Sequence, residues 1–372
     1  FGVAFFILTQ AQTSGFEHLF IQTILGTDGA IRVSDRMQKT SSSHRFIEGI
    51  DYPSPLKGAI LAFPEVTGVA EVLRGSAKLD GGRKAAQDAQ AFGVNLREFR
   101  KVSHLDGQVI FGSLADFEKT PQGILVGSEL AGENRANVRP GDIVTLIAGN
   151  NAQRFTVCGI FETGVGDIDK VRVITHIAAA RSLLSRPFGA TYLQVSIKDP
   201  EVAPGLSLRL SALLKHYASS WQHREKTWLL VFSALRVSAA VTVSTIILVS
   251  ALGMFNTLAM LVIEKTREIA ILRSFGFSKS DVTRIFLWLG FVVILAGSTL
   301  GCVMGALFTF AAEHIPMRLR GIFSTEHFIV KWDADHYLAA IVSAIVVVTI
   351  ASYFPARRAA RIEPGDIIRG AS

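Results

Sequence analysis

The most distinctive chemical groups of this chain are the charged side chains between positions 264 and 281, in the segment EKTREIAILRSFGFSKSD. The segment lies between two uncharged runs, 237–263 and 285–312. Each run exceeds the roughly 20 apolar residues that cross a bilayer as a helix. Acidic and basic side chains held at a membrane surface can form ion pairs and charged hydrogen bonds with another protein. The pattern therefore predicts a docking element and not a catalytic one.

The usual arrangements for catalysis are missing from the sequence. The uncharged runs contain no acid pair, no histidine cluster and no Ser–His arrangement. No glycine-rich run ends in Lys-Ser or Lys-Thr, as a phosphate-binding loop would. Cys158 and Cys302 are the two cysteines, and we expect Cys158 to be a buried small hydrophobe in a strand. We therefore predict no catalytic residue, no bound metal and no bound cofactor in this chain.

The charged segment has the spacing of a short amphipathic helix over residues 264–276. Ile269, Leu272 and Phe275 recur at every third position, while charged residues occupy the remaining surface. An ordinary loop that happens to be amphipathic is the alternative, and spacing alone does not choose between the two.

The ends of this helix also have local signals. Gly276 is a natural left-handed stop. Ser278 is followed three residues later by Asp281, which is a variant of the capping box. The sequence therefore predicts a helix, a tight turn and a second helix.

Membrane helices must position this segment, and we predict four of them. The chain opens with nine residues, FGVAFFILT, that are too few to span a bilayer. We interpret them as the outer half of a first, truncated helix that ends near Ala11. The others are predicted at about 228–263, 285–312 and 337–354.

Polar and small residues inside the predicted spans have two interpretations each. Arg236 could extend to the headgroup zone, or it could contact substrate or a partner helix. Gly297, Gly301 and Gly305 are spaced four apart, which allows close helix packing.

The distribution of basic residues predicts the orientation in the membrane. The loop between the second and third spans contains Lys265, Arg267, Arg273, Lys279 and Arg284. The last span is followed by Arg357, Arg358, Arg361 and Arg369. The opposite loop, 313–336, has Arg318, Arg320 and Lys331 with four acids. The positive-inside rule places the 264–284 loop in the cytoplasm and the large domain outside. The basic residues form no stripe with aromatics, so the net charge of +7 does not indicate nucleic acid.

The region between the first two spans has mixed α+β patterning. Strand-like segments are 123–126, 143–148, 154–161, 171–175 and 191–197, and helix-like segments are 176–184 and 205–216. A Gly149-Asn150-Asn151 turn joins two of the strands in a hairpin. For Trp221 and Trp228 we favour a place in an interfacial aromatic belt over packing inside the domain.

Two long motifs are similar to those of a known family. Residues 264–276 resemble the coupling-helix signature of FtsX/MacB-type ABC transporter permeases, and residues 354–364, FPARRAARIEP, resemble the C-terminal motif of the same superfamily. Four further segments resemble LolC/LolE lipoprotein-releasing permeases: Gly15-Phe16 as a turn into the outer domain, 92–95, 159–164 and 232–237. Residues 148–153 are too short for the carrier-binding hairpin of LolC-type proteins. The resemblance therefore implies either the partner-type subunit without this hairpin or a related exporter that needs no carrier. Ser238 replaces the family's acid.

The resemblance implies a fold class, membrane α-helical with a large extracytoplasmic α+β MacB-like domain between helices 1 and 2. The implied domains are 1–14 for the end of helix 1, 15–226 for the periplasmic domain and 227–372 for the FtsX-like permease domain. The implied function is that of a non-enzymatic permease subunit that releases lipoproteins from the outer leaflet of a bacterial inner membrane. A MacB-type efflux permease and an FtsX-type regulator of a cell-wall hydrolase are the alternatives.

The resemblance also implies partners and site residues. ATP and Mg would bind to a cytoplasmic ATPase dimer, and a second permease subunit would complete the transporter. The residues implied in coupling to the ATPase are Glu264, Lys265, Thr266, Arg267, Glu268, Ile269, Ile271, Leu272, Arg273, Phe275 and Gly276. The candidates for a substrate chamber are Ser14, Phe16, Phe232, Leu235 and Arg236.

Overall fold

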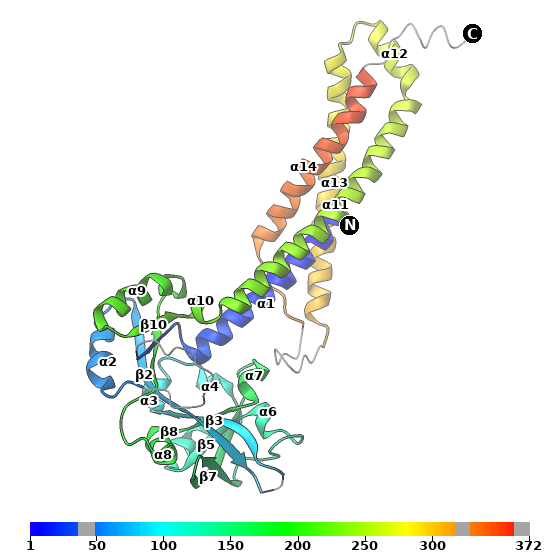
Figure 1. The fold of residues 1–372 in the computed structure, drawn as a ribbon. Coiled ribbons are helices and arrows are strands. Elements are labelled where there is room, and N and C mark those ends of the chain that lie inside the picture. The colour runs from blue at the N-terminus through cyan, green and yellow to red at the C-terminus, as the bar shows by residue number, and fades with distance from the viewer. Residues whose placement is uncertain (36–48, 83, 317–327, 361–372) are drawn as a thin grey trace. The chain divides into compact units, whose positions relative to one another are not determined.

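A computed structural model of the chain describes residues 1–35, 49–82, 84–316 and 328–360 (Figure 1). These residues form two compact units, one from 1–18, 230–316 and 328–360, and one from 19–35, 49–82 and 84–229. Helices α1 (Gly2–Asp28) and α11 (Lys226–Glu264) each contribute residues to both units. The last four residues of the C-terminal motif, 361–364, lie outside the described residues, as do Arg318 and Arg320 of the predicted loop and Arg369 after the last span.

The first unit is helical. Besides α1 and α11 it contains α12 (Thr266–Ser274), α13 (Lys279–Glu313) and α14 (Ala334–Ala360). Three helical stretches of the described chain are long and apolar enough to cross a membrane, namely α11, α13 and Ala334–Ala351 of α14. They coincide with the second, third and fourth predicted spans. Helix α1 is not among them, so the predicted count of four membrane helices is not confirmed.

Helix α1 is longer than the sequence predicted. We expected a first helix that ends near Ala11 and a turn at Gly15-Phe16, and both expectations are wrong. The helix continues to Asp28 because no proline interrupts it. Gly15 lies inside the helix, where a Cβ atom would come within 2.9 Å of the backbone of Val330. This glycine therefore allows close packing rather than a turn.

Close helix packing was predicted at three glycines of α13, and two of them lie against α1. A Cβ atom on Gly301 would lie 2.7 Å from Cβ of Val3. On Gly305 it would lie 3.0 Å from Cδ1 of Ile7. Gly297 faces open space. The absence of side chains at Gly301 and Gly305 lets the two helices approach closely.

The second unit is built on a ten-stranded sheet within the described residues. Its strands are β1 (Ile31–Ser34), β2 (Val66–Asp80), β3 (Gln87–Val94), β4 (Val109–Gly112), β5 (Gly123–Gly127), β6 (Ile143–Ala148), β7 (Asn151–Phe161), β8 (Arg172–His176), β9 (Tyr192–Ile197) and β10 (Tyr217–Ser220). The order is β10-β1-β9-β2-β3-β8-β5-β7-β4, and β6 pairs with β2 and β7. The β3–β8 and β5–β7 pairs are parallel and the others are antiparallel.

Short helices cover this sheet. They are α2 (Pro53–Leu61), α3 (Leu96–Phe99), α4 (Leu105–Gln108), α5 (Leu114–Lys119), α6 (Ser128–Ala131), α7 (Gly166–Asp169), α8 (Ile177–Leu183), α9 (Ala203–Leu214) and α10 (Trp221–Arg224), with the 3₁₀ helix η1 (Pro200–Val202). Side chains alternate between the two faces of a strand. On β3, accordingly, Phe92 and Val94 belong to one buried cluster and Ala91 to another.

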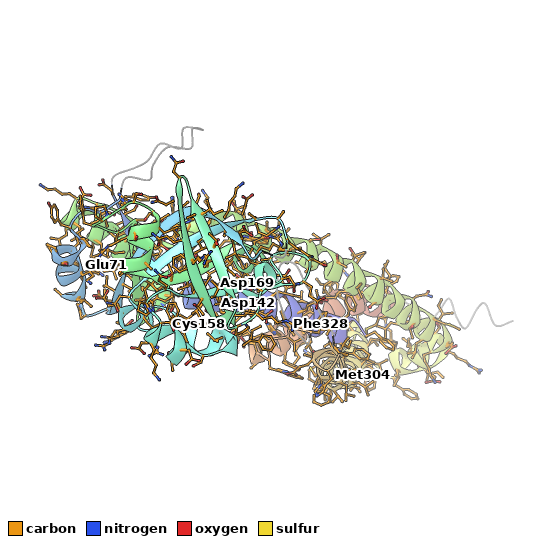
Figure 2. All side chains as sticks on the ribbon, turned by 90° about the horizontal axis from the view of Figure 1, so that it is seen from below. Glu71, Asp142, Cys158, Asp169, Met304 and Phe328 are labelled. Carbon is orange, nitrogen blue, oxygen red and sulfur yellow. The ribbon has the colours of Figure 1, made fainter. Side chains whose placement is uncertain are left out.

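The α+β prediction for this unit is correct in its main elements. Strands and helices lie within a few residues of every predicted segment, and β6 and β7 form the predicted hairpin with Ala148 opposite Asn151. Cys158 is buried among apolar side chains of the sheet, as expected (Figure 2). The prediction of an interfacial aromatic belt is wrong for Trp221. This residue is 2% exposed and donates its ring N–H to the Pro200 carbonyl at 3.0 Å. Apolar residues on β1, β9 and α9 provide enough contact to bury this ring in the domain.

Candidate functional site

The charged segment forms the predicted helix–turn–helix within the first unit. Glu264 is the last residue of α11, α12 covers Thr266–Ser274, and Gly276 follows with a φ of +96°. The amide of Gly276 donates to the Arg273 carbonyl at 3.1 Å, and that of Phe277 donates to Leu272 at 3.3 Å. These bonds satisfy carbonyl groups that the helix end would otherwise leave open.

The next helix begins with the predicted capping box. The Ser278 hydroxyl accepts from the Asp281 amide at 3.2 Å, and the Asp281 carboxylate accepts from the Ser278 amide at 3.0 Å. Each side chain thus satisfies a backbone N–H group at the start of α13. The position where α13 begins is therefore set by local residues.

A small apolar core holds α12 in place. Ile269 is buried together with Val262 of α11 and with Val282 and Phe286 of α13. Thr266 donates its hydroxyl to the Val262 carbonyl at 2.9 Å. A helix of nine residues is too short to be stable alone in water, so these contacts decide its position.

The outer surface of the segment combines apolar and charged side chains. Phe275 is 79% exposed, and Ile271, Arg267 and Glu268 are also exposed. The sequence assigned Phe275 to the same helical face as Ile269, and this part of the prediction is wrong. At 3.6 residues per turn, six positions place Phe275 about 120° around the helix from Ile269, so the two do not share the buried face.

Two of the chamber candidates have contacts near the start of α14: Ser14 contacts α14 itself, and Phe16 contacts the segment before it. The Ser14 hydroxyl lies 3.0 Å from Nε2 of His336. The rings of Phe16 and Phe328 meet edge to face with centroids 6.2 Å apart. Phe328 is labelled in Figure 2. The Lys331 amide donates to the Ala11 carbonyl at 2.9 Å, which ties the same segment to α1. These candidates therefore have contacts within the chain.

The three candidates on α11 differ in exposure. Phe232 is 4% exposed, whereas Leu235 and Arg236 are exposed. The Arg236 guanidinium forms an ion pair with the Glu17 carboxylate of α1, with Nη2 and Oε1 3.5 Å apart. This ion pair is a polar contact of the kind that the second interpretation of Arg236 includes. The structure brings Arg236 next to α1 but does not gather all five candidates around one point.

Sequence reasoning missed Glu17, His336 and Phe328, although one signal was available. Glu17 is the single acid in the first 27 residues. Arg236 is the single charged residue between Lys226 and Glu264, the two ends of α11. An isolated acid and an isolated base in neighbouring helices indicate a possible pair. No comparable signal exists for Phe328, because its contact with Phe16 spans more than 300 residues.

The described part of the chain offers no metal site, since no group of three or more His, Cys, Asp or Glu side chains is placed to hold an ion. The site consists instead of an exposed, mixed apolar and charged surface on α12 between two candidate spans. Such a surface can bind another protein.

Two family models match the chain. Residues 1–213 match the MacB-like periplasmic core domain, and residues 240–364 match the FtsX-like permease C-terminal domain.

Individual relatives are similar over most of their length. The lipoprotein-releasing system transmembrane protein LolC of Xylella fastidiosa is 28% identical over 331 residues, which cover 82% of this chain and 78% of that protein. The corresponding protein LolE of Haemophilus influenzae is 24% identical and covers 99% of this chain and 91% of its own. The crystal structure of the periplasmic region of MacB from Actinobacillus actinomycetemcomitans covers 56% of this chain and 94% of its own, with 15% identity and a TM-score of 0.39.

Proposed function

The chain belongs to the family of FtsX-like ABC transporter permeases with a MacB-like periplasmic core domain, and from this premise we propose that it is the permease subunit of a lipoprotein-releasing transporter. Its relatives are named as transmembrane proteins of lipoprotein-releasing systems. ATP hydrolysis then takes place in a separate ATPase dimer that binds ATP and Mg. A second permease subunit, identical or homologous, completes the complex in a bacterial inner membrane, with the large domain in the periplasm.

The observation that carries the proposal is the exposed surface of α12. Phe275 is apolar and 79% exposed, and Ile271 is apolar and 48% exposed, whereas the neighbouring Ile269 is buried. Exposed apolar side chains flanked by charges are typical of protein-binding surfaces. Because α12 lies between two candidate spans, a soluble ATPase could bind here without entering the membrane.

Force transmission from such a surface requires stiff helices. Helix α11 has 39 residues in one continuous run, a length of about 58 Å at 1.5 Å per residue. It contains no proline and one glycine, Gly253. Proline is the commonest cause of a sharp kink, so this helix is suited to transmit a displacement along its axis.

In the proposed cycle, closure of the ATPase dimer displaces α12, and α11 transmits this displacement towards the periplasmic domain. The two-residue turn of the β6–β7 hairpin leaves no long hook for a periplasmic carrier. The chain is therefore suited to the role of a subunit that does not itself hold the carrier, next to a partner that does.

Co-purification tests the central part of the proposal. A tagged chain extracted from its native membrane in mild detergent should recover an ABC ATPase at a ratio of one ATPase per permease chain. Recovery of the permease without any ATPase would remove the basis of the proposal.

Photo-crosslinking then identifies the substrate. Phe232 is too buried to report on a ligand, so the crosslinking residue should replace Leu235, which is exposed on the same helix. Leu252, also exposed on α11, is the matched control position. Acylated lipoproteins trapped at Leu235 and not at Leu252 would support lipoprotein release. Small molecules would support MacB-type export, and a single cell-wall hydrolase would support an FtsX-type regulator.

A further inference from the structure

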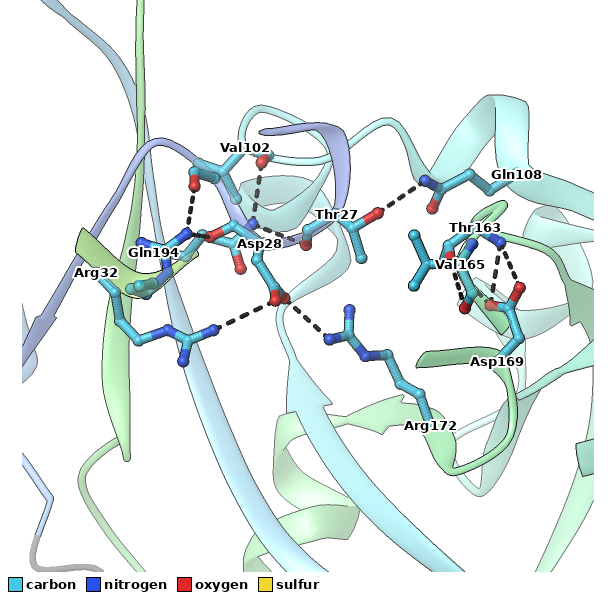
Figure 3. Close-up of polar contacts among 12 residues, drawn as sticks. Thr27, Asp28, Arg32, Val102, Gln108, Thr163, Val165, Asp169, Arg172 and Gln194 are labelled. Atoms are coloured by element: carbon cyan, nitrogen blue, oxygen red, sulfur yellow. Dashed lines mark hydrogen bonds and ion pairs between the residues drawn. The ribbon is translucent and has the colours of Figure 1, made fainter. Parts of the chain in front are cut away.

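The end of α1 and the residues just before α11 meet inside the second unit around one partly buried carboxylate and the backbone carbonyls beside it. Asp28 is the last residue of α1, and its side chain is 14% exposed. Its Oδ1 accepts a hydrogen bond from Nη2 of Arg172 on β8 at 2.9 Å. Its Oδ2 lies 3.5 Å from Nη2 of Arg32 on β1. Figure 3 shows both arginines pointing at this carboxylate from different strands.

A third arginine connects the same place to α11. Arg224 is the last residue of α10, two positions before α11 begins. Its Nη2 donates to the backbone carbonyls of Gly29 at 2.7 Å and Asp28 at 3.4 Å. A guanidinium is favourable there because carbonyl groups at a helix C-terminus carry partial negative charge.

The main chain reinforces this junction. Strand β1 follows α1, strand β10 precedes α10, and the two pair antiparallel with Ile31 opposite Ser220. The Trp221 amide donates to the Ala30 carbonyl at 2.8 Å. The chain therefore enters and leaves the domain through neighbouring strands.

The last turn of α1 is also fixed by neutral contacts. The Thr27 carbonyl accepts from Nε2 of Gln194 at 3.2 Å, and the Thr27 hydroxyl accepts from Nε2 of Gln108 at the same distance (Figure 3). The His104 amide donates to the Gly26 carbonyl at 2.7 Å. This end of the helix cannot shift without breaking several hydrogen bonds to the sheet and its loops.

The charges at the junction depend on Asp28. Burial alone would raise the pKa of Asp28, but Arg172, Arg32 and Arg224 outweigh it and hold this pKa at about 2. If the carboxylate were neutral, three guanidinium groups would lie close together without this counter-charge.

We infer that Asp28 is a positioning residue that locks α1 and α11 to the same sheet, so that a displacement of either helix moves the domain instead of loosening the junction. This inference rests on the proposed function, because it explains how helix motion would reach the periplasmic domain. It assigns no contact with substrate to Asp28.

The test compares Asp28→Asn with a matched carboxylate elsewhere in the domain. Glu71 on β2 is 13% exposed and lies 2.9 Å from Lys57 and 3.5 Å from Arg181, neither of which belongs to α1, α10 or α11 (Figure 2). Both substitutions remove one buried charge with cationic partners, but only D28N removes it from the junction. Arg224→Gln is a second junction variant that leaves the Asp28–Arg172 hydrogen bond in place.

The first measurement is coupling in the complete complex. Permease and ATPase are reconstituted in proteoliposomes with a triacylated lipoprotein as the probe, and released probe is counted per ATP hydrolysed. D28N and R224Q should lower this ratio about fivefold or more while ATP hydrolysis continues, and E71Q should leave it within about twofold of the parent chain. An equal ratio in D28N and E71Q would overturn the inference.

The second measurement does not depend on transport. Hydrogen exchange of the Gly29, His104 and Trp221 amides should accelerate together by about tenfold in D28N and stay unchanged in E71Q. Acceleration at only one of these amides would show that the junction does not act as a unit.

If the parent complex releases no probe, the proposed function fails, and the exchange result still decides the role of Asp28. If D28N does not fold, R224Q and the conservative variant Asp28→Glu provide the same comparison.

Discussion

Two buried aspartates of the same domain show how partners decide the charge of a carboxyl group. Asp28 faces guanidinium groups, and its pKa is held at about 2. Asp169 on α7 accepts hydrogen bonds from the Thr163 amide at 3.1 Å and from the Thr163 hydroxyl at 2.9 Å (Figure 3). Burial raises the pKa of Asp169 to about 6, because neutral donors compensate only part of the lost hydration. The two groups therefore respond to pH in opposite directions.

The raised pKa of Asp169 predicts a pH-dependent cost in stability. The folded state binds a proton more tightly than the unfolded state, whose pKa is near 3.8. The contribution of the protonated Asp169 carboxyl to stability is therefore greatest below pH 4 and is lost as pH rises through about 6. At neutral pH the ionised group costs about 2 to 3 kcal/mol. Asp169→Asn, which keeps an oxygen for both Thr163 donors, should raise the melting temperature by about 5 °C at pH 7.5 and change it little at pH 4.5.

Asp167→Asn on the same helix is the control for this prediction. Asp167 is exposed and forms an ion pair of 3.1 Å with Lys170, so its removal should shift the melting temperature by less than about 1 °C at either pH. Fluorescence melting of the full chain in detergent measures both variants. A D169N effect of equal size at pH 4.5 and 7.5 would contradict the assigned pKa.

At the scale of single elements, α12 illustrates how a short helix depends on its neighbours. Lys265 and Glu268 form an exposed ion pair of 2.6 Å, which adds little stability. The buried Ile269 and the caps at Gly276 and Ser278 fix the helix instead. The exposed charges can therefore be changed without unfolding the segment.

Charge reversal on α12 should separate ATP hydrolysis from transport. We expect the double variant Arg267→Glu, Glu268→Arg to keep its melting temperature within about 2 °C, since both side chains are exposed. Transport per ATP should fall about tenfold or more, because the charges would no longer match those of the ATPase. Lys198→Glu with Glu201→Arg, an equal reversal at exposed positions of the other unit, should have no effect. Unchanged transport in the α12 variant would exclude this surface as the ATPase contact.

The glycine contact between α1 and α13 gives a second prediction at this scale. Gly301→Leu should destabilise the packing of α1 by about 1 to 3 kcal/mol, because even a Cβ atom would lie 2.7 Å from Val3. Gly297→Leu should be tolerated, since nothing lies within 4 Å of its Cβ position. Fluorescence melting of the full chain in detergent compares the two variants with the parent chain. Equal melting temperatures in both variants would show that this contact does not hold α1.

For the whole molecule, patterns that repeat over a few residues were predictable and contacts between distant residues were not. The β6–β7 hairpin, the capping box at Ser278 and the three apolar helices follow from spacing and turn residues. The continuation of α1 to Asp28 was missed because resemblance suggested a turn where no helix breaker exists. Asp28 and Arg172 lie 144 positions apart, and neither has a local signal that identifies the other. The junction at Asp28 therefore became visible only in the folded chain.

The orientation of the whole molecule remains a prediction from charge. Lysine and arginine are concentrated in the 264–284 segment, which predicts that α12 faces the cytoplasm and the large domain faces the periplasm. Both natural cysteines suit a labelling test. Cys158 is buried, burial raises the pKa of its thiol, and Cys302 lies within a candidate span. Neither should react quickly with a charged maleimide.

Single new cysteines should therefore report the two sides of the membrane. Leu208 on α9 is 73% exposed and Phe275 is exposed after α12, so Leu208→Cys and Phe275→Cys present accessible thiols in the two units. In cells with a permeabilised outer membrane, an impermeant maleimide should label L208C and leave F275C unlabelled. After the inner membrane is lysed, the labelling rates of L208C and F275C should agree within about twofold, because both thiols are exposed to solvent. Labelling of F275C before lysis would reverse the proposed orientation, and an ATPase bound from the cytoplasm could then no longer reach α12.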